Sequence, residues 1–228
     1  MTPSTALSDT FVFLRQFART ARTTGAIAPS GRALSRALVQ HVRPGDPDRP
    51  RAVLEVGPGT GAVTRHLVQR LGPDDSLDLV EANPRFAEQL STFLDHDPRM
   101  AEVTGRVRLI HGLVQEHVLG SYDTIVCGLP FANFPPDQIM AIFGQLLASL
   151  TPNGRLSFFS YSGGDAVCRF APSQMLSRQA LRESVERNLV ERELVLRNLP
   201  PAWVYHLAAY PSPRPASGPA RHTRESAD

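Results

Sequence analysis

The chain has 228 residues, of which 42% are hydrophobic and 20% charged, which is enough to bury the core of one sizeable domain. No apolar run approaches the roughly 18 residues that cross a bilayer, and the N-terminus lacks the pattern of a secretory signal, so we expect a cytoplasmic protein. Cys127 and Cys168 are the only cysteines and have neither CxxC nor metal-ligand spacing, which argues against a disulfide framework and a metal site.

Positive charge is concentrated near the N-terminus. All 24 basic residues are arginine, and the net charge of +2 is too small to indicate a nucleic-acid partner. Residues 1–45, however, hold six arginines against one acid. Apolar residues at helical spacing predict an amphipathic helix over 9–21, and a break at 24–30 precedes a second helix over 31–42. The first helix is expected either to lie on an anionic membrane or to pack against the main domain.

Strand and helix patterns alternate through residues 46–210, which predict one α/β domain. Strands are expected near 52–56, 77–81, 107–110, 123–127 and 155–160, and helices near 62–71, 84–94 and 135–150. Such alternation implies parallel strands with a ligand site outside their carboxyl ends. Segments 189–196 and 203–210 are closely joined and predict an antiparallel hairpin. We therefore expect a Rossmann-like fold with a seven-stranded, mostly parallel sheet, N-terminal helices and a disordered tail over 211–228.

A glycine-rich turn follows the first predicted strand. Glu55 lies near the end of that strand, and Gly57, Gly59 and Gly61 follow, with Thr60 between the last two. Glycines permit positive φ angles and let a ligand lie against bare backbone. The carboxylate would repel a pyrophosphate and attract a cationic amino acid such as that of S-adenosylmethionine (SAM). The pattern resembles the first motif of class I SAM-dependent methyltransferases, whose product is S-adenosylhomocysteine.

The ends of the second and third predicted strands complete the expected cofactor site. Glu81 ends the second strand about 20 residues beyond the glycines, which suits hydrogen bonds to ribose hydroxyls, and Ala82 lies beside it. After the third strand, Gly112 and Leu113 are expected next to the adenine, although Leu113 stands where an aspartate is common in these enzymes. His111 is a candidate general base, with a role in capping the strand end as the alternative.

The fourth strand is followed by Gly128, Leu129, Pro130 and Phe131. This segment resembles the Asn-Pro-Pro-Tyr type of motif of amino-methyltransferases, in which carbonyl oxygens and an aromatic ring hold the target amine, but it lacks the leading asparagine. Tyr161, at the end of the fifth strand, is expected beside the same site, where an aromatic face stabilises a growing ammonium charge by about 0.5–2 kcal/mol. The alternatives are an ordinary strand-to-helix loop and a tyrosine packed in the core.

Several segments together resemble the small bacterial phospholipid N-methyltransferases, namely 13–38, 55–61, 80–84, 128–131 and 198–205. The resemblance implies SAM as donor and stepwise methylation of phosphatidylethanolamine toward phosphatidylcholine. It also implies an N-terminal helix that rests on an anionic membrane. The residues that would cover the SAM pocket are Thr24, Gly25, Pro29 and Ser30. Those that would contact the acceptor are Arg19, Arg22, Phe131 and Tyr205.

Three other functions remain open from the sequence. The chain could methylate a soluble metabolite, bind SAM without catalysis as a membrane-interaction module, or methylate RNA in the manner of the ribosomal RNA adenine dimethylases. RNA methylation predicts strong, salt-sensitive RNA binding, which the near-neutral core does not favour. We expect a monomer.

Overall fold

The computed structural model describes residues 31–43, 49–97, 100, 103–131, 134–162, 176, 179, 182–183 and 185–209. The predictions for the first helix, for residues 24–30, for Arg19 and Arg22 and for the tail over 211–228 lie outside the described residues. Among the helices of the described ranges, none is both long enough and apolar enough to cross a membrane.

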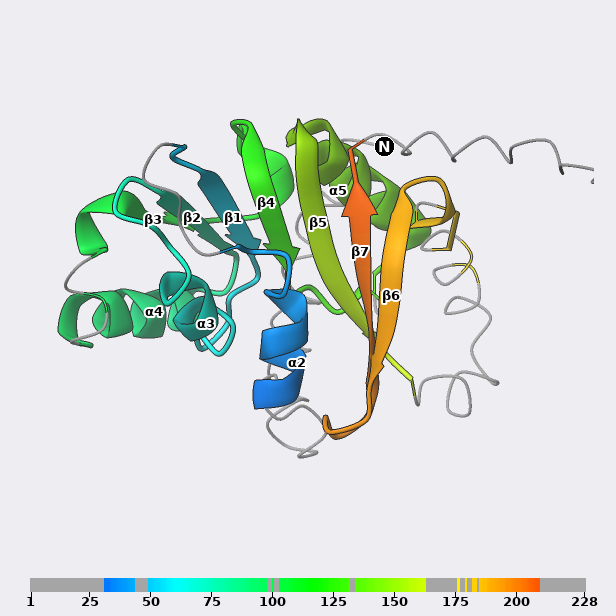
Figure 1. Cartoon of the computed structure of the whole chain (residues 1–228), viewed down its shortest axis with the longest axis horizontal. Helices are drawn as coiled ribbons and strands as arrows, with labels where there is room; N and C mark the ends of the chain where they lie inside the picture. Colours follow the sequence, from blue (N-terminus) through cyan, green and yellow to red (C-terminus); the bar gives the residue numbers. More distant parts are fainter. Residues whose placement is uncertain are drawn as a thin grey trace, which may run out of the picture.

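The described strands form one seven-stranded sheet in the order β3-β2-β1-β4-β5-β7-β6 (Figure 1). The first five strands of this order run parallel, and β7 lies antiparallel to both β5 and β6. The strands are β1 (Ala52–Val56), β2 (Ser76–Glu81), β3 (Val107–His111), β4 (Tyr122–Cys127), β5 (Leu150–Tyr161), β6 (Leu189–Val195) and β7 (Ala202–Ala208). This arrangement confirms the predicted mostly parallel sheet with a terminal antiparallel hairpin.

Strand β5 begins earlier than the sequence predicted. Leu150 already pairs with Tyr122, and the register then shifts before Arg155 pairs with Thr124. Pro152 lies in this irregular stretch and has no N–H to give to a ladder, so the sequence pattern indicated the strand only from residue 155.

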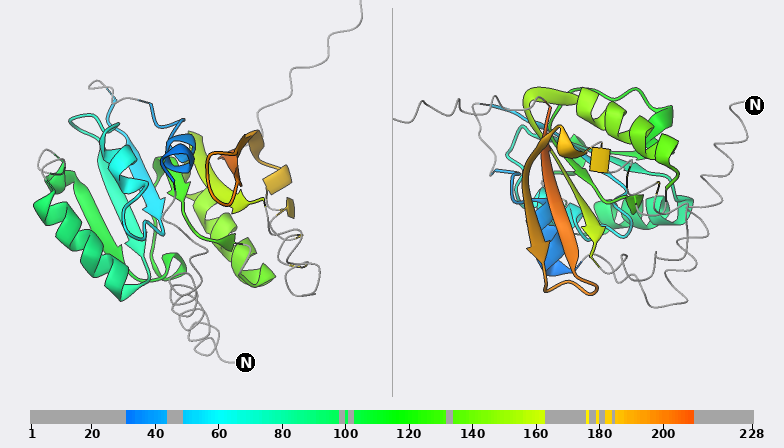
Figure 2. Two further views of the ribbon diagram at one scale, coloured as in Figure 1. Left: turned by 90° about the horizontal axis from the view of Figure 1, so that it is seen from below. Right: turned by 90° about the vertical axis from the view of Figure 1, so that its right-hand side faces the viewer.

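Helices cover both faces of the sheet (Figure 2). The helices α2 (Arg32–Leu38), α3 (Thr64–Val68) and α4 (Pro84–His96) contribute to the core on one face, and α5 (Pro136–Ala148) contributes to the core on the other. Short 3₁₀ turns lie at Thr104–Arg106 and Val114–Glu116. Both α2 and α3 are shorter than predicted. The residues that follow them form hydrogen bonds from residue i to residue i−3, such as Leu71 N to Val68 O, which are typical of 3₁₀ turns and not of an α-helix.

A buried histidine of β7 ties the segment after α2 to the sheet. His206 Nδ1 lies 2.8 Å from Ser157 Oγ on β5, and His206 Nε2 lies 2.9 Å from Gln40 Nε2. Because the amide nitrogen of Gln40 is a donor, His206 Nε2 accepts and Nδ1 carries the proton toward Ser157. Burial and the neighbouring His41 lower the pKa of His206 to about 4, so the ring is neutral at neutral pH. This network holds α2 over β5 and β7.

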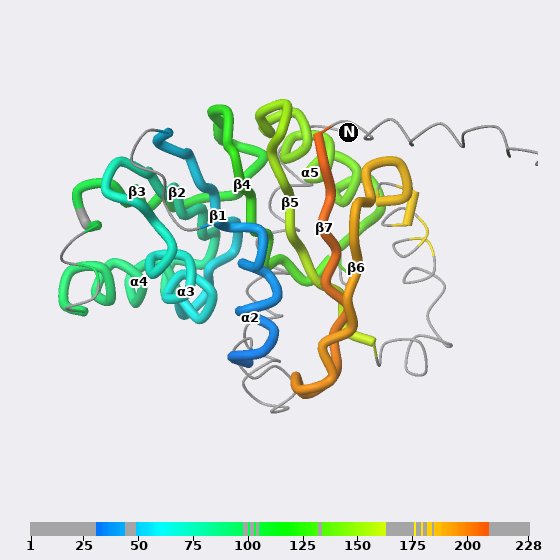
Figure 3. Tube along the Cα trace, in the orientation of Figure 1, coloured from blue at the N-terminus to red at the C-terminus, as the bar shows by residue number. Residues whose placement is uncertain are grey.

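The carboxyl ends of the parallel strands and the β6–β7 turn lie at one edge of the sheet, which is the lower edge in Figures 1 and 3. Gly57 N donates to Val80 O, so the β1–β2 ladder extends one residue past β1. Strand β7 begins opposite the end of β5, since Ala202 pairs with Tyr161. Most of the predicted site residues therefore belong to loops of this edge.

Candidate functional site

The three glycines of the turn after β1 all have positive φ angles, 71° at Gly57, 57° at Gly59 and 78° at Gly61. A Cβ atom on Gly57 would lie 2.9 Å from Leu129 Cδ2, and one on Gly61 would lie 3.2 Å from Leu90 Cδ1. On Gly59 a Cβ would meet no atom of the described chain within 4 Å. Gly57 and Gly61 are therefore needed for close packing, and the open backbone of the turn is at Gly59.

Glu81, at the end of β2, holds the open part of this turn. Its Oε2 accepts a hydrogen bond from Gly59 N at 2.9 Å, and its Oε1 accepts one from Asn83 N at 2.8 Å. Only 6% of the residue is exposed, and burial raises the pKa of Glu81 in spite of these two bonds. Each carboxylate oxygen keeps a further lone pair, so Glu81 can still accept from ribose hydroxyls.

Glu55 lies beneath the turn, where it is 2% exposed. Its Oε2 accepts from Thr64 Oγ1 at 2.7 Å. Burial raises the pKa of Glu55 to about 8, although the bond from Thr64 opposes the rise. Any attraction of Glu55 for a cation therefore acts across the glycine backbone and not by direct contact. The sequence analysis did not identify Thr64 as the partner of Glu55. Its hydroxyl, in the first turn after the glycine motif, was a signal that could have indicated this role.

These features fit a ligand that carries both a cation and a ribose. Glu55 and Glu81 lie close enough for the charge of Glu81 to raise the pKa of Glu55 further. A pyrophosphate at this turn would meet the carboxylate of Glu81, and the glycine spacing is one residue shorter than the dinucleotide fingerprint. The open backbone at Gly59 and the acceptor oxygens of Glu81 therefore suit SAM better than NAD or ATP.

Beyond β3, Leu113 lies next to an acid that the sequence did not single out. Glu116 Oε2 accepts from Leu113 N at 3.2 Å. The Leu113 side chain is buried, and a Cβ on Gly112 (φ 147°) would lie 2.5 Å from His117 Nε2. Glu116 therefore brings a carboxylate to the turn after β3, and one of its oxygens is occupied by the backbone N–H of Leu113.

His111 lies at the end of β3, far across the sheet from β4. It pairs with Glu81 in the β2–β3 ladder, and its side chain is exposed. Because β2 and β1 lie between β3 and β4, three strand spacings of about 4.8 Å separate His111 from the loop after β4. His111 cannot reach an acceptor held at β4, which corrects its assignment as a general base and places it beside the cofactor carboxylate.

The loop after β4 packs directly on the glycine turn. Gly128 N donates to Val56 O at 2.8 Å, and a Cβ on Gly128 would lie 2.7 Å from Gly57 O. Leu129 and Pro130 are half-buried. Within the described ranges, no hydrogen bond reaches the carbonyl oxygens of Gly128 and Pro130. The loop therefore brings two carbonyl acceptors to the immediate neighbourhood of the turn.

Phe131 lies in the core, and Tyr205 is half-buried in the middle of β7, away from the carboxyl edge. Phe131 is 1% exposed, and its ring centroid lies 4.6 Å from that of Phe143 on α5. Tyr205 stacks on Phe158 with 4.9 Å between centroids, in the middle of β7. These positions correct the predicted contacts of both rings with an acceptor. Phe131 instead anchors the loop that precedes it.

Tyr161 ends β5, one strand away from the loop after β4. The residue is half-buried, and its ring meets that of Phe159 edge-on at 5.1 Å. Burial raises the pKa of Tyr161, so the phenol keeps its proton at neutral pH. Tyr161 can therefore contribute a hydroxyl or an aromatic face, and not a phenolate base.

Comparison with known proteins agrees with this geometry. A family model described as a methyltransferase domain matches residues 54–156. The ornithine lipid N-methyltransferase of Singulisphaera acidiphila is 30% identical over 148 residues, which are 65% of this chain and 76% of that protein. The malonyl-[acyl-carrier protein] O-methyltransferase of Halalkalibacterium halodurans is 28% identical over 171 residues, which are 73% of this chain and 60% of that protein.

Solved structures share the fold at low sequence identity. The O-methyltransferase TomG from Streptomyces achromogenes, solved in complex with SAM, superimposes with a TM-score of 0.59 and 17% identity. The match covers 86% of this chain and 89% of that chain. Because relatives named for N- and O-methylation share one architecture, the fold alone does not specify the atom that receives the methyl group.

Proposed function

Because the chain belongs to the class I SAM-dependent methyltransferases, in the family of the bacterial lipid N-methyltransferases, we propose that it methylates the amine of a membrane lipid. Phosphatidylethanolamine, converted stepwise toward phosphatidylcholine, is the first acceptor to test. Ornithine lipid is the second, because a relative that is 30% identical is named for it. The observation that carries the proposal is the packing of the Gly128–Leu129–Pro130 loop on the glycine turn, which joins carbonyl acceptors to the cofactor site.

SAM supplies a methyl group on a sulfonium that is already activated for transfer. What the chain contributes is position, since holding reactants at near-attack distance can supply roughly 7–11 kcal/mol in the best cases. The carbonyl oxygens of Gly128 and Pro130 accept the amine N–H groups and orient the nitrogen. The Tyr161 ring lies at the end of the neighbouring strand, where an aromatic face stabilises the ammonium that forms by about 0.5–2 kcal/mol.

The proton of the acceptor amine has to leave before transfer. His111 is too far from β4, and Tyr161 keeps its own proton because its pKa is raised. Neither the predicted base His111 nor the neighbouring Tyr161 is therefore suited to take this proton. We infer that water takes the proton and that the site selects the neutral amine.

The proposal is tested by incubating the protein with isotope-labelled SAM and liposomes that contain phosphatidylethanolamine or ornithine lipid. We expect label in a lipid product with one or more added methyl groups, identified by mass spectrometry. Parallel incubations with amine metabolites and with RNA test the other acceptors. Label confined to a water-soluble metabolite or to RNA would overturn the lipid proposal, while turnover on no amine despite SAM binding would indicate a non-catalytic module.

The same proposal covers the location of the enzyme. We propose a cytoplasmic monomer whose catalytic domain spans 46–210, whose residues 1–45 contact an anionic membrane and cover the SAM site, and whose residues 211–228 form a tail. Deletion of residues 1–22 should then reduce methylation of lipid in vesicles much more than it reduces SAM binding. Full lipid activity after this deletion would contradict the membrane role of the segment.

A further inference from the structure

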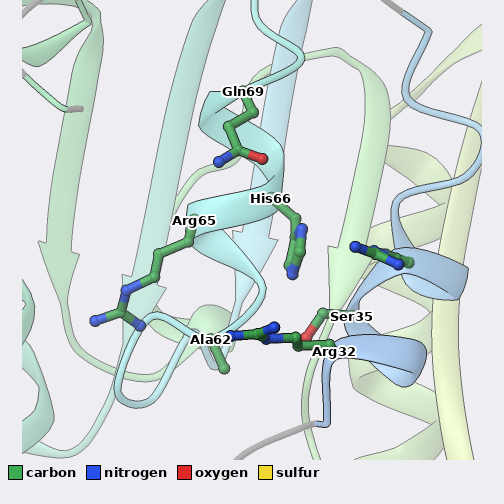
Figure 4. A pocket seen from close by; sticks show the side chains of 7 residues that line it. Arg32, Ser35, Ala62, Arg65, His66 and Gln69 are labelled. Atoms are coloured by element: carbon green, nitrogen blue, oxygen red, sulfur yellow. The ribbon is translucent and has the colours of Figure 1, made fainter.

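A groove of about 440 Å³ lies between α2 and α3 (Figure 4). Arg32 and Arg36 line it from α2, Arg65 and His66 line it from α3, and Gln69 lines it from the end of α3. In Figure 4 the His66 ring points into the space between the helices, and Arg32 reaches across from α2 toward Ala62. The groove begins beside the glycine turn, because Ala62 follows directly on that turn.

The groove carries positive charge that no described acid neutralises. Arg65 is engaged, since its Nη1 donates to Thr60 O at 3.1 Å and its guanidinium lies 4.4 Å from the centroid of the Phe93 ring. Arg32 and Arg36, in contrast, form no hydrogen bond or ion pair through their side chains in the described ranges. Two exposed guanidinium groups therefore face one concave surface without a counter-ion.

His66 lies in the field of these arginines. Burial lowers the pKa of His66, and the charges of Arg36, Arg70 and Arg32 lower it further. The ring is therefore neutral at neutral pH and can donate one N–H group to a ligand. A bound anion would relieve the repulsion among the cations and would favour protonation of His66.

We propose that this groove is a binding site for a phosphate group. Arg32 and Arg36 lie one helical turn apart, so their forked guanidinium groups can grip the same tetrahedral oxyanion. The His66 ring and the Gln69 amide add neutral donors. The site is separate from the glycine turn, where the Glu81 carboxylate creates the opposite potential and disfavours an anion. The proposal concerns binding alone and does not depend on the identity of the methyl acceptor.

The neighbouring surface indicates the source of the phosphate. Asn198 Oδ1, in the β6–β7 turn, accepts from Gly31 N at 3.0 Å, which fixes this turn next to Arg32. Leu196 and Leu199 flank Asn198 and are 70% and 87% exposed. Exposed leucines beside arginines fit the interface of an anionic bilayer, which attracts both apolar and cationic side chains. A phospholipid headgroup is therefore the favoured source, and free phosphate is the other source of the same chemistry.

The binding site is tested by NMR titration of the His66 ring in the full chain with and without inorganic phosphate. The His66 signal is assigned with the His66→Gln variant. We expect phosphate to raise the pKa of His66 and to shift its resonances saturably. In the Arg32→Gln/Arg36→Gln variant the pKa of His66 should be higher already, and the phosphate affinity should fall at least about tenfold, which corresponds to about 1.4 kcal/mol.

The matched control is the Arg182→Gln/Arg187→Gln variant. It removes the same charge from exposed positions that precede β6, whereas the groove lies beside the turn that follows β6. The control should bind phosphate as the unmodified chain does, and it should also keep SAM affinity. Absence of any phosphate effect on His66, or equal loss in the groove and control variants, would overturn the site.

Vesicle sedimentation separates the two sources. Vesicles of phosphatidylglycerol in phosphatidylcholine are compared with vesicles of phosphatidylcholine alone, with and without inorganic phosphate as competitor. Binding that phosphate competes away, and that the groove variant loses while the control variant keeps it, would support the lipid headgroup as ligand. Vesicle binding that is unchanged in the groove variant, together with a normal His66 response to inorganic phosphate, would assign the groove to free phosphate and overturn the lipid source.

Discussion

The two halves of the carboxyl edge are held in place by different forces. The donor half, where we propose that SAM binds, consists of the turn over 55–61 and of Glu81. Polar contacts fix it, because both carboxylate oxygens of Glu81 accept hydrogen bonds from backbone N–H groups. The acceptor half consists of the loop over 128–130 and of Tyr161, and apolar packing fixes it, through Phe131 below the loop and Phe159 beside the tyrosine. Hydrogen bonds thus preform the donor half, whereas apolar packing positions the acceptor half.

The largest expected effect comes from an alanine at the contact between the halves. In Gly57→Ala, the positive φ angle costs about 1–2 kcal/mol, and the overlap of the new Cβ with Leu129 adds a similar amount. We expect the free energy of unfolding to fall by about 2–4 kcal/mol in urea denaturation. The loop over 128–130 should move as well, so lipid methylation should be lost more completely than SAM binding.

Gly59→Ala is the matched variant, because its φ angle is also positive but its Cβ would meet no described atom within 4 Å. It should lose only about 1–2 kcal/mol of stability. The methyl group would occupy the open backbone of the donor half, so SAM affinity measured by calorimetry should fall at least about tenfold. Unchanged SAM affinity would show that the cofactor does not lie against Gly59 and would contradict the assignment of the turn to the donor half.

The same division explains how much the sequence could predict. Glu55, the glycines and Glu81 lie within one strand–turn–helix–strand unit, so spacing alone brings them together. The contact of Gly57 with Leu129 depends on the place of β4 beside β1, which the alternating pattern did not specify. The predicted acceptor contact of Phe131 was wrong for a related reason. The sequence alone does not show whether a phenylalanine after a strand points to a substrate or, as Phe131 does, into the core.

Within the donor half, Glu81→Ala should have the next largest effect. The change removes two charge-assisted bonds to backbone N–H groups and the proposed acceptor for ribose, each worth about 1.5–3 kcal/mol. We expect SAM affinity to fall about 100-fold in calorimetry. Asn83→Ala is the control, because it removes the cap that accepts from Arg85 N but keeps the bond from Asn83 N to Glu81. It should lose about 1 kcal/mol of stability and keep SAM affinity.

Glu55→Gln separates charge from packing in the same half. The pKa of Glu55 is raised to about 8, so the folded chain holds a proton that the unfolded chain releases above its ordinary pKa near 4.5. The native residue therefore loses stability as the pH rises from about 4.5 to about 8, and the glutamine variant does not. Urea denaturation should show stabilities within about 1 kcal/mol of each other at about pH 5 and a variant more stable by roughly 2–3 kcal/mol at about pH 6.5.

The affinity of the same variant for SAM tests the attraction across the turn. If the ionised carboxylate favours the cation, Glu55→Gln should weaken binding about tenfold at neutral pH, and the difference should widen as the pH approaches about 8. A variant that binds SAM as well as the native chain at every pH would reduce Glu55 to a packing residue. The donor half would then depend on Glu81 alone.

The smallest expected effect lies on the other side of the comparison, in the network that supports α2 beside the acceptor half. The pKa of His206 is lowered to about 4, and His41 and the Gln40 amide face its ring. Since the unfolded chain takes up the proton near pH 6.5 and the folded chain does not, the stability that His206 contributes is present above about pH 6.5 and is lost as the pH falls toward about 4. The expected loss of stability between about pH 7 and about pH 5 is roughly 2 kcal/mol. Because Glu55 acts in the opposite direction over part of this range, the quantity to measure is the difference in unfolding free energy between the native chain and His206→Gln at each pH. That difference should shrink as the pH falls. If the unfolding free energies of the two proteins instead changed in parallel with pH, the packing around α2, and not the neutral histidine, would stabilise this side of the sheet.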